Sequence, residues 1–184
     1  MSTSYIPPSS SSSSSIVDRI RRAAMLDASL YEEVEHDTSA TGQAAVVVAL
    51  SVVGAAVGNL WRGGGSRGLI GGLLAALLGW AAWSGITYVV GTRLFGGRAT
   101  WGEVLRTVGF AQAPGILLAL RIVPGLGWLV SFAVSIWLLA TGFVALRQAL
   151  DLDTGKTLLT VVVGWLANVI IGLFLGAVLL PFRG

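Results

Sequence analysis

Hydrophobic and polar positions are segregated between residues 42 and 180, where long apolar runs are separated by short breaks that hold most of the charge. The runs at residues 43–60, 68–90, 127–146 and 157–180 contain no charged residue. A helix rises about 1.5 Å per residue and needs roughly 20 such residues to cross the hydrocarbon layer of a bilayer. Backbone polar groups in that layer must bond internally, which favours continuous helices. The pattern predicts an all-α, polytopic integral membrane helical bundle.

Five transmembrane helices are expected, at residues 42–60, 68–90, 108–123, 127–146 and 157–180. The third is short and is broken by Pro114, so we expect it to be kinked or tilted. Arg121 ends this span, and its long stem lets the guanidinium reach a membrane interface. Pro124 opens a tight turn that leads to the fourth span through Gly127.

The chain before the first span divides into two parts. Residues 1–15 are rich in serine and proline, so we expect them to be disordered, and they lack the basic start and apolar core of a signal peptide. Residues 16–40 predict short cytoplasmic helices, the first with Ile16 and Ile20 on one face and the second opened by a capping box at Ser29. The first helix could lie on the membrane interface or pack on the protein's own cytoplasmic ends.

Composition narrows the classes of function. Hydrophobic residues make up 54% of the chain, charged residues 11%, and the mean hydropathy is +0.80. There is no cysteine, which removes thiolate nucleophiles and thiolate metal sites. The net charge of +3 comes from basic residues scattered among the membrane-flanking breaks, so we expect no nucleic-acid partner.

Few residues are candidates for binding a metal or a cofactor. The acidic residues around His36 have no metal-ligand spacing and are interpreted as a solvated face, and Asp151 and Asp153 as helix caps. Gly63, Gly65 and Gly68 match a dinucleotide-binding pattern but lie between two apolar helices, where a flexible turn is expected.

No span contains a carboxylate, so we expect no catalytic residue, metal or cofactor. Neutral polar residues at depth more often bond between helices than contact a substrate. Convergence of four of them on one cavity would instead favour a conduit for lipid or a small solute: Ser84, Gln112, Ser135 and Asn168.

Basic residues predict the orientation of the bundle. With five spans and a cytoplasmic N-terminus, eight basic residues lie inside: Arg19, Arg21, Arg22, Arg93, Arg98, Arg106, Arg147 and Lys156. Four lie outside: Arg62, Arg67, Arg121 and Arg183. The excess inside predicts a cytoplasmic N-terminus and an external C-terminus.

Small residues recur at the four-residue spacing that lets membrane helices approach closely. The pairs are Gly54 with Gly58, Gly68 with Gly72, and Gly172 with Gly176. Packing within the bundle is the favoured interpretation, and a dimer interface is the alternative.

The segment TWGEVLRTVGFAQAP at residues 100–114, followed by ILLALRIVPGLGWLV, resembles the Yip (Ypt/Rab-interacting protein) family. The resemblance covers residues 42–180 and includes SIWLLATGFVALRQAL and a glycine-rich last helix. It implies five membrane helices, a cytoplasmic N-terminus, a non-catalytic role and, for eukaryotic members, Rab-type GTPase partners. The serine-rich N-terminal region departs from the family, so we expect a prokaryotic member of the inner membrane that does not bind a Rab-type GTPase.

The lead-in to the third span supplies most candidate functional residues. Residues 100–106 are expected to lie at the interface with Trp101, Val104 and Leu105 facing lipid, and Glu103 is expected to pair with Arg106. Pro114 leaves the Phe110 carbonyl without its helical donor. Gln112 or a neighbouring helix would then supply that donor. The full candidate set is Trp101, Glu103, Arg106, Phe110, Gln112, Pro114, Arg121, Pro124 and Asn168.

The function expected from these features is that of a non-enzymatic membrane organiser or adaptor. Its partners would be the lipid bilayer and a membrane protein or a second copy of the chain. A lipid or small-solute conduit is the alternative.

Overall fold

A computed structural model describes residues 15–60 and 66–179, and the side chains of residues 15–60 and 69–171. The described part of the chain folds into helices joined by short turns and contains no strand. Its elements in order are α1 (Ile16–Ala24), α2 (Ala28–His36), α3 (Ala40–Gly58), α4 (Ser66–Phe95), α5 (Trp101–Phe110), the 3₁₀ helix η2 (Ala113–Ile122), α6 (Gly127–Ala149) and α7 (Thr154–Leu179). The disorder expected for the serine-rich start and the turn expected at Gly63 lie outside the described residues.

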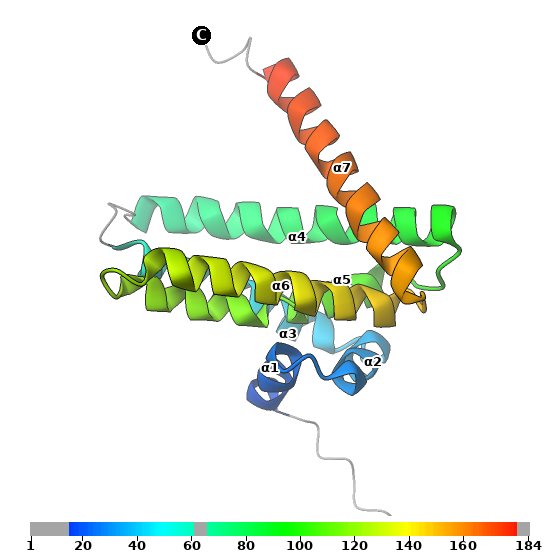
Figure 1. The fold of residues 1–184 in the computed structure, drawn as a ribbon, viewed down its shortest axis with the longest axis horizontal. Helices are drawn as coiled ribbons and strands as arrows, with labels where there is room; N and C mark the ends of the chain where they lie inside the picture. The colour runs from blue at the N-terminus through cyan, green and yellow to red at the C-terminus, as the bar shows by residue number, and fades with distance from the viewer. Residues whose placement is uncertain (1–14, 61–65, 180–184) are drawn as a thin grey trace, which may run out of the picture.

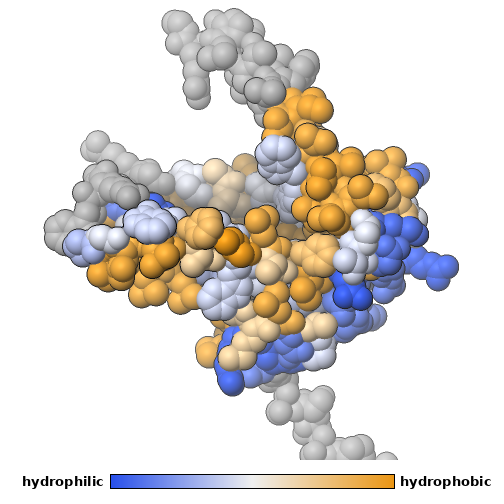
Figure 2. All heavy atoms as spheres, viewed as in Figure 1, coloured by the Kyte–Doolittle hydropathy of each residue, from blue (hydrophilic) through white to orange (hydrophobic). Residues whose placement is uncertain are grey.

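Five segments of the described chain are long and apolar enough to cross a membrane: Ala40–Gly58, Leu69–Phe95, Trp101–Ile122, Gly127–Ala149 and Thr154–Ile171. This confirms the prediction of a polytopic helical bundle with five spans. In Figure 1, α4 and α6 run along the bundle, whereas α7 crosses near one end of α4 and then leads away from the other helices. Figure 2 shows that the hydrophilic surface gathers over α1, α2 and the adjacent end of the bundle.

The third span consists of two different helices. It begins at Trp101, not near Val108 as predicted, because the lead-in is part of the span. The ten residues of α5 rise about 15 Å as an α-helix, and the ten residues of η2 rise about 20 Å as a 3₁₀ helix. Their sum exceeds the hydrocarbon thickness of roughly 30 Å. The 22-residue span would exceed this thickness even as a continuous α-helix. The 3₁₀ geometry of η2 lengthens it by a further ~5 Å.

The backbone of η2 lies directly on α3. A Cβ atom added at Gly54 would be 2.5 Å from the Ile116 carbonyl oxygen, and one added at Gly58 would be 2.1 Å from the Leu118 carbonyl oxygen. Only glycine allows such an approach. This glycine pair therefore serves packing within the bundle, as the favoured interpretation predicted.

The two N-terminal helices, α1 and α2, pack on the bundle, and we call them the N-terminal helix pair. Leu30, Tyr31 and Val34 are fully buried and belong to a cluster that includes Phe110 of α5 and Ala145 of α6. The indole of Trp137 on α6, a position outside the pair, donates a hydrogen bond of 2.7 Å to the Ala24 carbonyl. Of the two placements considered for the first helix, the structure therefore has it packed on the protein.

Candidate functional site

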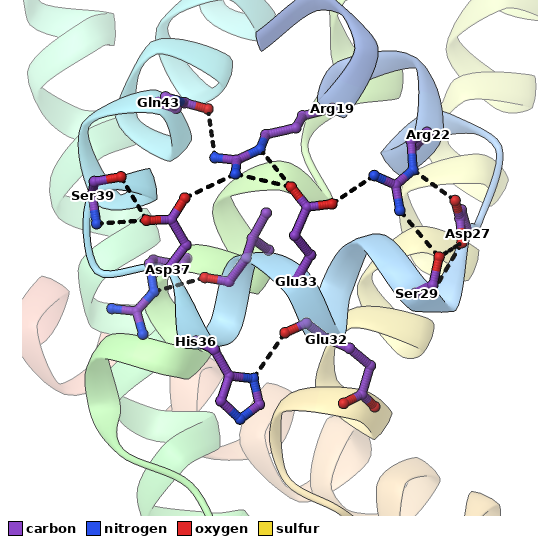
Figure 3. Close-up of polar contacts among 12 residues, drawn as sticks. Arg19, Arg22, Asp27, Ser29, Glu32, Glu33, His36, Asp37, Ser39 and Gln43 are labelled. Atoms are coloured by element: carbon purple, nitrogen blue, oxygen red, sulfur yellow. Dashed lines mark hydrogen bonds and ion pairs between the residues drawn. The ribbon is translucent and has the colours of Figure 1, made fainter. Parts of the chain in front are cut away.

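A network of charged side chains joins α1 to α2 and α3 (Figure 3). The buried guanidinium of Arg19 donates to Glu33 at 3.0 Å, to Asp37 at 2.8 Å and to the Gln43 side chain at 3.0 Å. Ser39 donates its backbone N–H and hydroxyl to the other Asp37 oxygen. These hydrogen bonds lower the pKa of Asp37, that from Ser39 most and that from Arg19 next. The buried arginine is fully paired, as a buried charge must be.

A second arginine extends the network along α2. Arg22 donates to Asp27 at 2.8 Å and to Glu33 at 2.6 Å. Asp27 is the N-cap of α2 and accepts the Ser29 N–H, so the cap predicted at Ser29 lies two residues too late. Hydrogen bonds from Ser29 and then Arg22 lower the pKa of Asp27 to about 2. The predicted solvated acidic face is wrong for Glu33 and Asp37, since both bind arginine.

Arg106 of α5 binds the C-terminal end of α2. Its guanidinium, only 6% exposed, donates to the carbonyl of Val34 at 2.9 Å and to the carbonyl of Glu35. A cation is stabilised there by the last carbonyls of the helix. The predicted Glu103–Arg106 pair is wrong, because Glu103 forms a capping box with Thr100 at the start of α5.

Glu35 is a buried carboxyl beside this contact. Its residue is 8% exposed, its Oε2 has no hydrogen-bond partner, and its Oε1 lies 3.4 Å from Nδ1 of His36. Burial and the nearby charge of Glu32 raise the pKa of Glu35 from 4.5 to about 7, with smaller contributions from Asp151 and Glu103. The contact between α2 and α5 therefore contains a carboxyl that titrates near neutral pH.

The Pro114 break is stabilised by a neighbouring helix. The N–H of Gly115 bonds to the Gln112 carbonyl, so the Ala111 carbonyl loses its usual helical donor. Thr141 of α6 donates its hydroxyl to that carbonyl at 2.8 Å. The expected compensation by a neighbouring helix is therefore present, although at Ala111 and not at Phe110.

Gln112 lies between two cavities at this break. One, of about 420 Å³, is lined by residues of α4, α5, α6 and α7, and the other, of about 260 Å³, lies between α3 and α4. Gln112, Trp83 and Val108 line both cavities. Among the described residues, no group hydrogen-bonds the Gln112 side chain. The Gln112 side chain thus borders a cavity on each side of the third span.

Comparison with protein-family models identifies the family of this chain. The family model of the Yip1 domain matches residues 28–176, from the first residue of α2 nearly to the end of α7. The chain belongs to the Yip1 domain family. Neither the curated proteins nor the solved structures contain a match. The Yip1 family is not known as a family of enzymes.

The Yip1 match is wider than the resemblance over residues 42–180, because it includes α2. The contact of Arg106 with the end of α2 therefore lies inside the Yip1 domain. Arg19 and Arg22 precede the match, so the ion pairs of α1 attach a segment outside the matched domain to it.

The remaining candidates of the Yip1 domain do not form one site. Phe110 is fully buried in the core, whereas Trp101 is 48% exposed at the start of α5. Arg121 packs against α3, and its buried Nε has no hydrogen-bond partner. Pro124 is exposed in the turn before α6, and Asn168 is exposed on α7. These residues are spread over the length of the bundle.

Val104 was expected to face lipid but is fully buried, because α4 and α6 cover this side of α5. Asp153 accepts the Lys156 N–H at the start of α7, as the capping interpretation predicted. Asp151 adopts a φ of 51° and does not cap the helix. In the described part of the chain no three His, Cys, Asp or Glu residues are placed to hold a metal ion.

Sequence reasoning missed Arg19 and Thr141. A basic pair at positions 19 and 22 and an acidic pair at positions 33 and 37 have helical spacing, so their complementary charge was a usable signal. Thr141 gave no such signal, because its role depends on how α6 lies against the Pro114 break.

Proposed function

We propose that this Yip1 domain is a non-enzymatic membrane organiser or adaptor. The observation that carries the proposal is the contrast in burial among its spans. In the window that defines each span, 56% of Trp101–Ile122 is buried, but only 6% of Leu69–Phe95 in α4. A span so little covered by its own chain is available to other helices in the bilayer.

One face of α4 has the composition of a helix-packing surface. Its exposed residues are Gly71, Leu74, Ala75, Leu78 and Ala82. Gly71 and Ala75 have the four-residue spacing of small residues that lets two helices approach closely. A Cβ added at Gly71 would meet nothing within 4 Å, so no part of the described chain occupies this face. We propose that it takes a helix of a second copy or of another membrane protein.

The orientation follows from the positive-inside rule. We propose that the N-terminal helix pair is cytoplasmic, that the C-terminus is external, and that the membrane is the inner membrane of a prokaryote. The support is the excess of basic residues in the breaks assigned to the inside. Arg19 and Arg22 of that set bind the acidic side chain of Glu33 on α2. Arg106 lies inside the third span and binds α2 carbonyls.

The alternative, a conduit, would require polar side chains to converge on one path. Gln112 and Ser135 line the larger cavity. Ser84 is buried without lining either cavity, and Asn168 is exposed on α7. Two of the four residues meet, which favours the organiser over a continuous polar path.

Single cysteines test the proposal cleanly, because the chain has none of its own. We expect Leu74→Cys and Leu78→Cys, 57% and 71% exposed, to cross-link in native membranes to one defined second polypeptide. Phe132→Cys and Ile136→Cys on α6 have the same spacing and are 60% and 52% exposed, so they are the matched controls. Mass spectrometry of the product distinguishes a second copy from another protein. Equal cross-linking from α4 and α6, or none from α4, would refute the proposal.

A further inference from the structure

We infer that one edge of α1 lies in the adjacent leaflet of the bilayer and binds anionic phospholipid there. We call it the α1 edge, and it consists of Val17 and Arg21 on α1 and of Met25 and Leu26 directly after it. The ligand is lipid, so the inference goes beyond the proposed function and does not depend on a partner helix at α4.

The α1 edge is exposed and mostly apolar. Val17, Met25 and Leu26 are 71%, 62% and 38% exposed. Val17, Arg21 and Met25 recur every four residues, so they share one side of the helix. A group of exposed apolar side chains marks a contact site for another molecule or for a membrane.

The protein itself occupies the other sides of α1. Ala23 is fully buried, and Ile20 packs against the same core. Arg19 and Arg22 both bind a carboxylate of α2. With 3.6 residues per turn, the direction of Arg21 lies about 130° around the helix axis from the mean direction of these two arginines. The α1 edge therefore points away from α2.

The side of α1 that faces away from α2 faces the membrane. α1 contacts η2 of the third span, and the Trp137 indole of α6 donates to the Ala24 carbonyl at the end of α1. In Figure 1, α1 accordingly lies nearer the start of α6 than α2 does. Toward that start α6 exposes Phe132 and Ile136, which lie among lipid chains because α6 spans the membrane. The α1 edge thus adjoins the lipid-exposed surface of the bundle.

Arg21 supplies a charge that complements an anionic headgroup. The other two arginines of α1, Arg19 and Arg22, form ion pairs with Glu33. Within the part of the chain that the structure describes, no side chain pairs with Arg21. At a membrane surface an arginine keeps its stem among apolar groups while its guanidinium reaches the phosphates. A lipid phosphate is therefore the counter-ion that fits this position.

The backbone at Leu26 supports an apolar environment for the edge. The N–H of Leu26 bonds to the Ala23 carbonyl and the N–H of Asp27 to the Arg22 carbonyl, which together form a Schellman motif at the end of α1. Leu26 has a φ of 61° at the position that glycine usually occupies in this motif. An exposed leucine with a strained backbone gains nothing in water, whereas its side chain is stabilised among lipid chains.

Depth-dependent quenching tests the position of the edge. The full chain, which has no cysteine, is labelled with a fluorophore at Val17→Cys or Met25→Cys and placed in vesicles of phosphatidylcholine and phosphatidylglycerol. Part of the phosphatidylcholine carries a nitroxide on one acyl chain. We expect quenching close to that of Phe132→Cys, which faces lipid on α6. Glu32→Cys, on the exposed face of α2, is the matched control and should be quenched much less.

Amide hydrogen exchange of α1 in nanodiscs tests the role of Arg21. Protection of α1 should be about five-fold greater with phosphatidylglycerol present than with phosphatidylcholine alone, the effect of one basic side chain at an anionic surface. Arg21→Gln should abolish this difference, and Arg21→Lys, which keeps the charge, should restore it. In phosphatidylcholine alone the three proteins should exchange alike, which separates headgroup binding from a structural role.

Three results would overturn the inference. The first is quenching at Val17→Cys and Met25→Cys no stronger than at Glu32→Cys. The second is protection of α1 that does not respond to phosphatidylglycerol, or that responds equally in Arg21→Gln. The third is cross-linking of Met25→Cys to a second polypeptide in native membranes, which would show that protein covers the edge. Cross-linking from α4 is a separate measurement, so failure of the organiser proposal and failure of this lipid contact give different results.

Discussion

Replacing Arg106 by Met is expected to release the end of α2 from the bundle. The substitution removes the guanidinium that donates to the carbonyls of Val34 and Glu35 and keeps an apolar stem of similar length. The two partners lie 72 and 71 residues earlier in the chain, so the contact is tertiary and the helix α5 does not depend on it. Loss of local protection should therefore centre on α2.

The magnitude follows from the geometry. A hydrogen bond to a charged group contributes about 1.5–3 kcal/mol, and Arg106 makes two while only 6% exposed. Water can reach the two carbonyls once α2 separates, which offsets part of their sum. We expect a net loss of roughly 3 kcal/mol, or about a 100-fold increase in the opening of the N-terminal helix pair. Arg106→Lys keeps the charge but not the planar fork, and should recover about half of the loss.

Amide hydrogen exchange of the full chain in lipid nanodiscs measures this opening. Protection should fall in α2 of Arg106→Met, while protection of α3 and α6 stays at the wild-type level. Arg147→Met is the matched control, because Arg147 is exposed near the end of α6. Unchanged exchange of α2 in Arg106→Met, or an equal change in Arg147→Met, would refute the reasoning.

Three further predictions concern pH, close packing and the Pro114 break. Because burial raises the pKa of Glu35 to about 7, the protonated carboxyl stabilises the docked pair below about pH 4.5, and this stabilisation is lost as the pH rises through about 7. Glu35→Gln should abolish the difference in α2 protection, which is exchange relative to the intrinsic rate at each pH, between about pH 5 and about pH 8. Gly58→Ala places a Cβ 2.1 Å from an η2 carbonyl oxygen and should lower the thermal unfolding temperature in detergent, whereas Gly71→Ala, in open space, should not. Thr141→Val leaves the Ala111 carbonyl unpaired and should cost about 1–3 kcal/mol in the same unfolding assay, with recovery in Thr141→Ser.

Local sequence rules predicted the spans well and their side-chain partners poorly. Four of the five spans follow from block length alone, because the thickness of the bilayer fixes how many apolar residues a helix needs. The third begins seven residues before the predicted start, because its charged lead-in is part of the span. The three-residue spacing of Glu103 and Arg106 predicted an ion pair, but each found a better partner. Thr100 offers Glu103 an N-cap, and the end of α2 offers Arg106 two carbonyls that only the tertiary fold brings near. The burial of Val104 likewise depends on the helices that cover α5.

Among the site residues, too, some could be identified from the sequence pattern and others depend on the tertiary fold. Pro114 and Gln112 could be identified as a break and a polar residue at depth, since both are departures from an apolar pattern. Thr141 and the cavity could not be identified, because they arise where α6 lies against α5. A threonine in a membrane helix ordinarily bonds to its own preceding turn, and nothing in its neighbours along the chain indicates a second acceptor.

The contacts of α4 explain why the proposed activities do not compete. Its C-terminal half is held by the bundle, since Gly91 allows close contact with Leu150, and Arg98, just beyond the helix, donates its N–H to the Leu150 carbonyl. Its N-terminal half is exposed, with Ile70 and Leu78 each 71% accessible. A partner helix on this half would lie on the opposite side of the bundle from the N-terminal helix pair (Figure 1). Assembly through α4 and release of α2 can therefore be altered one at a time.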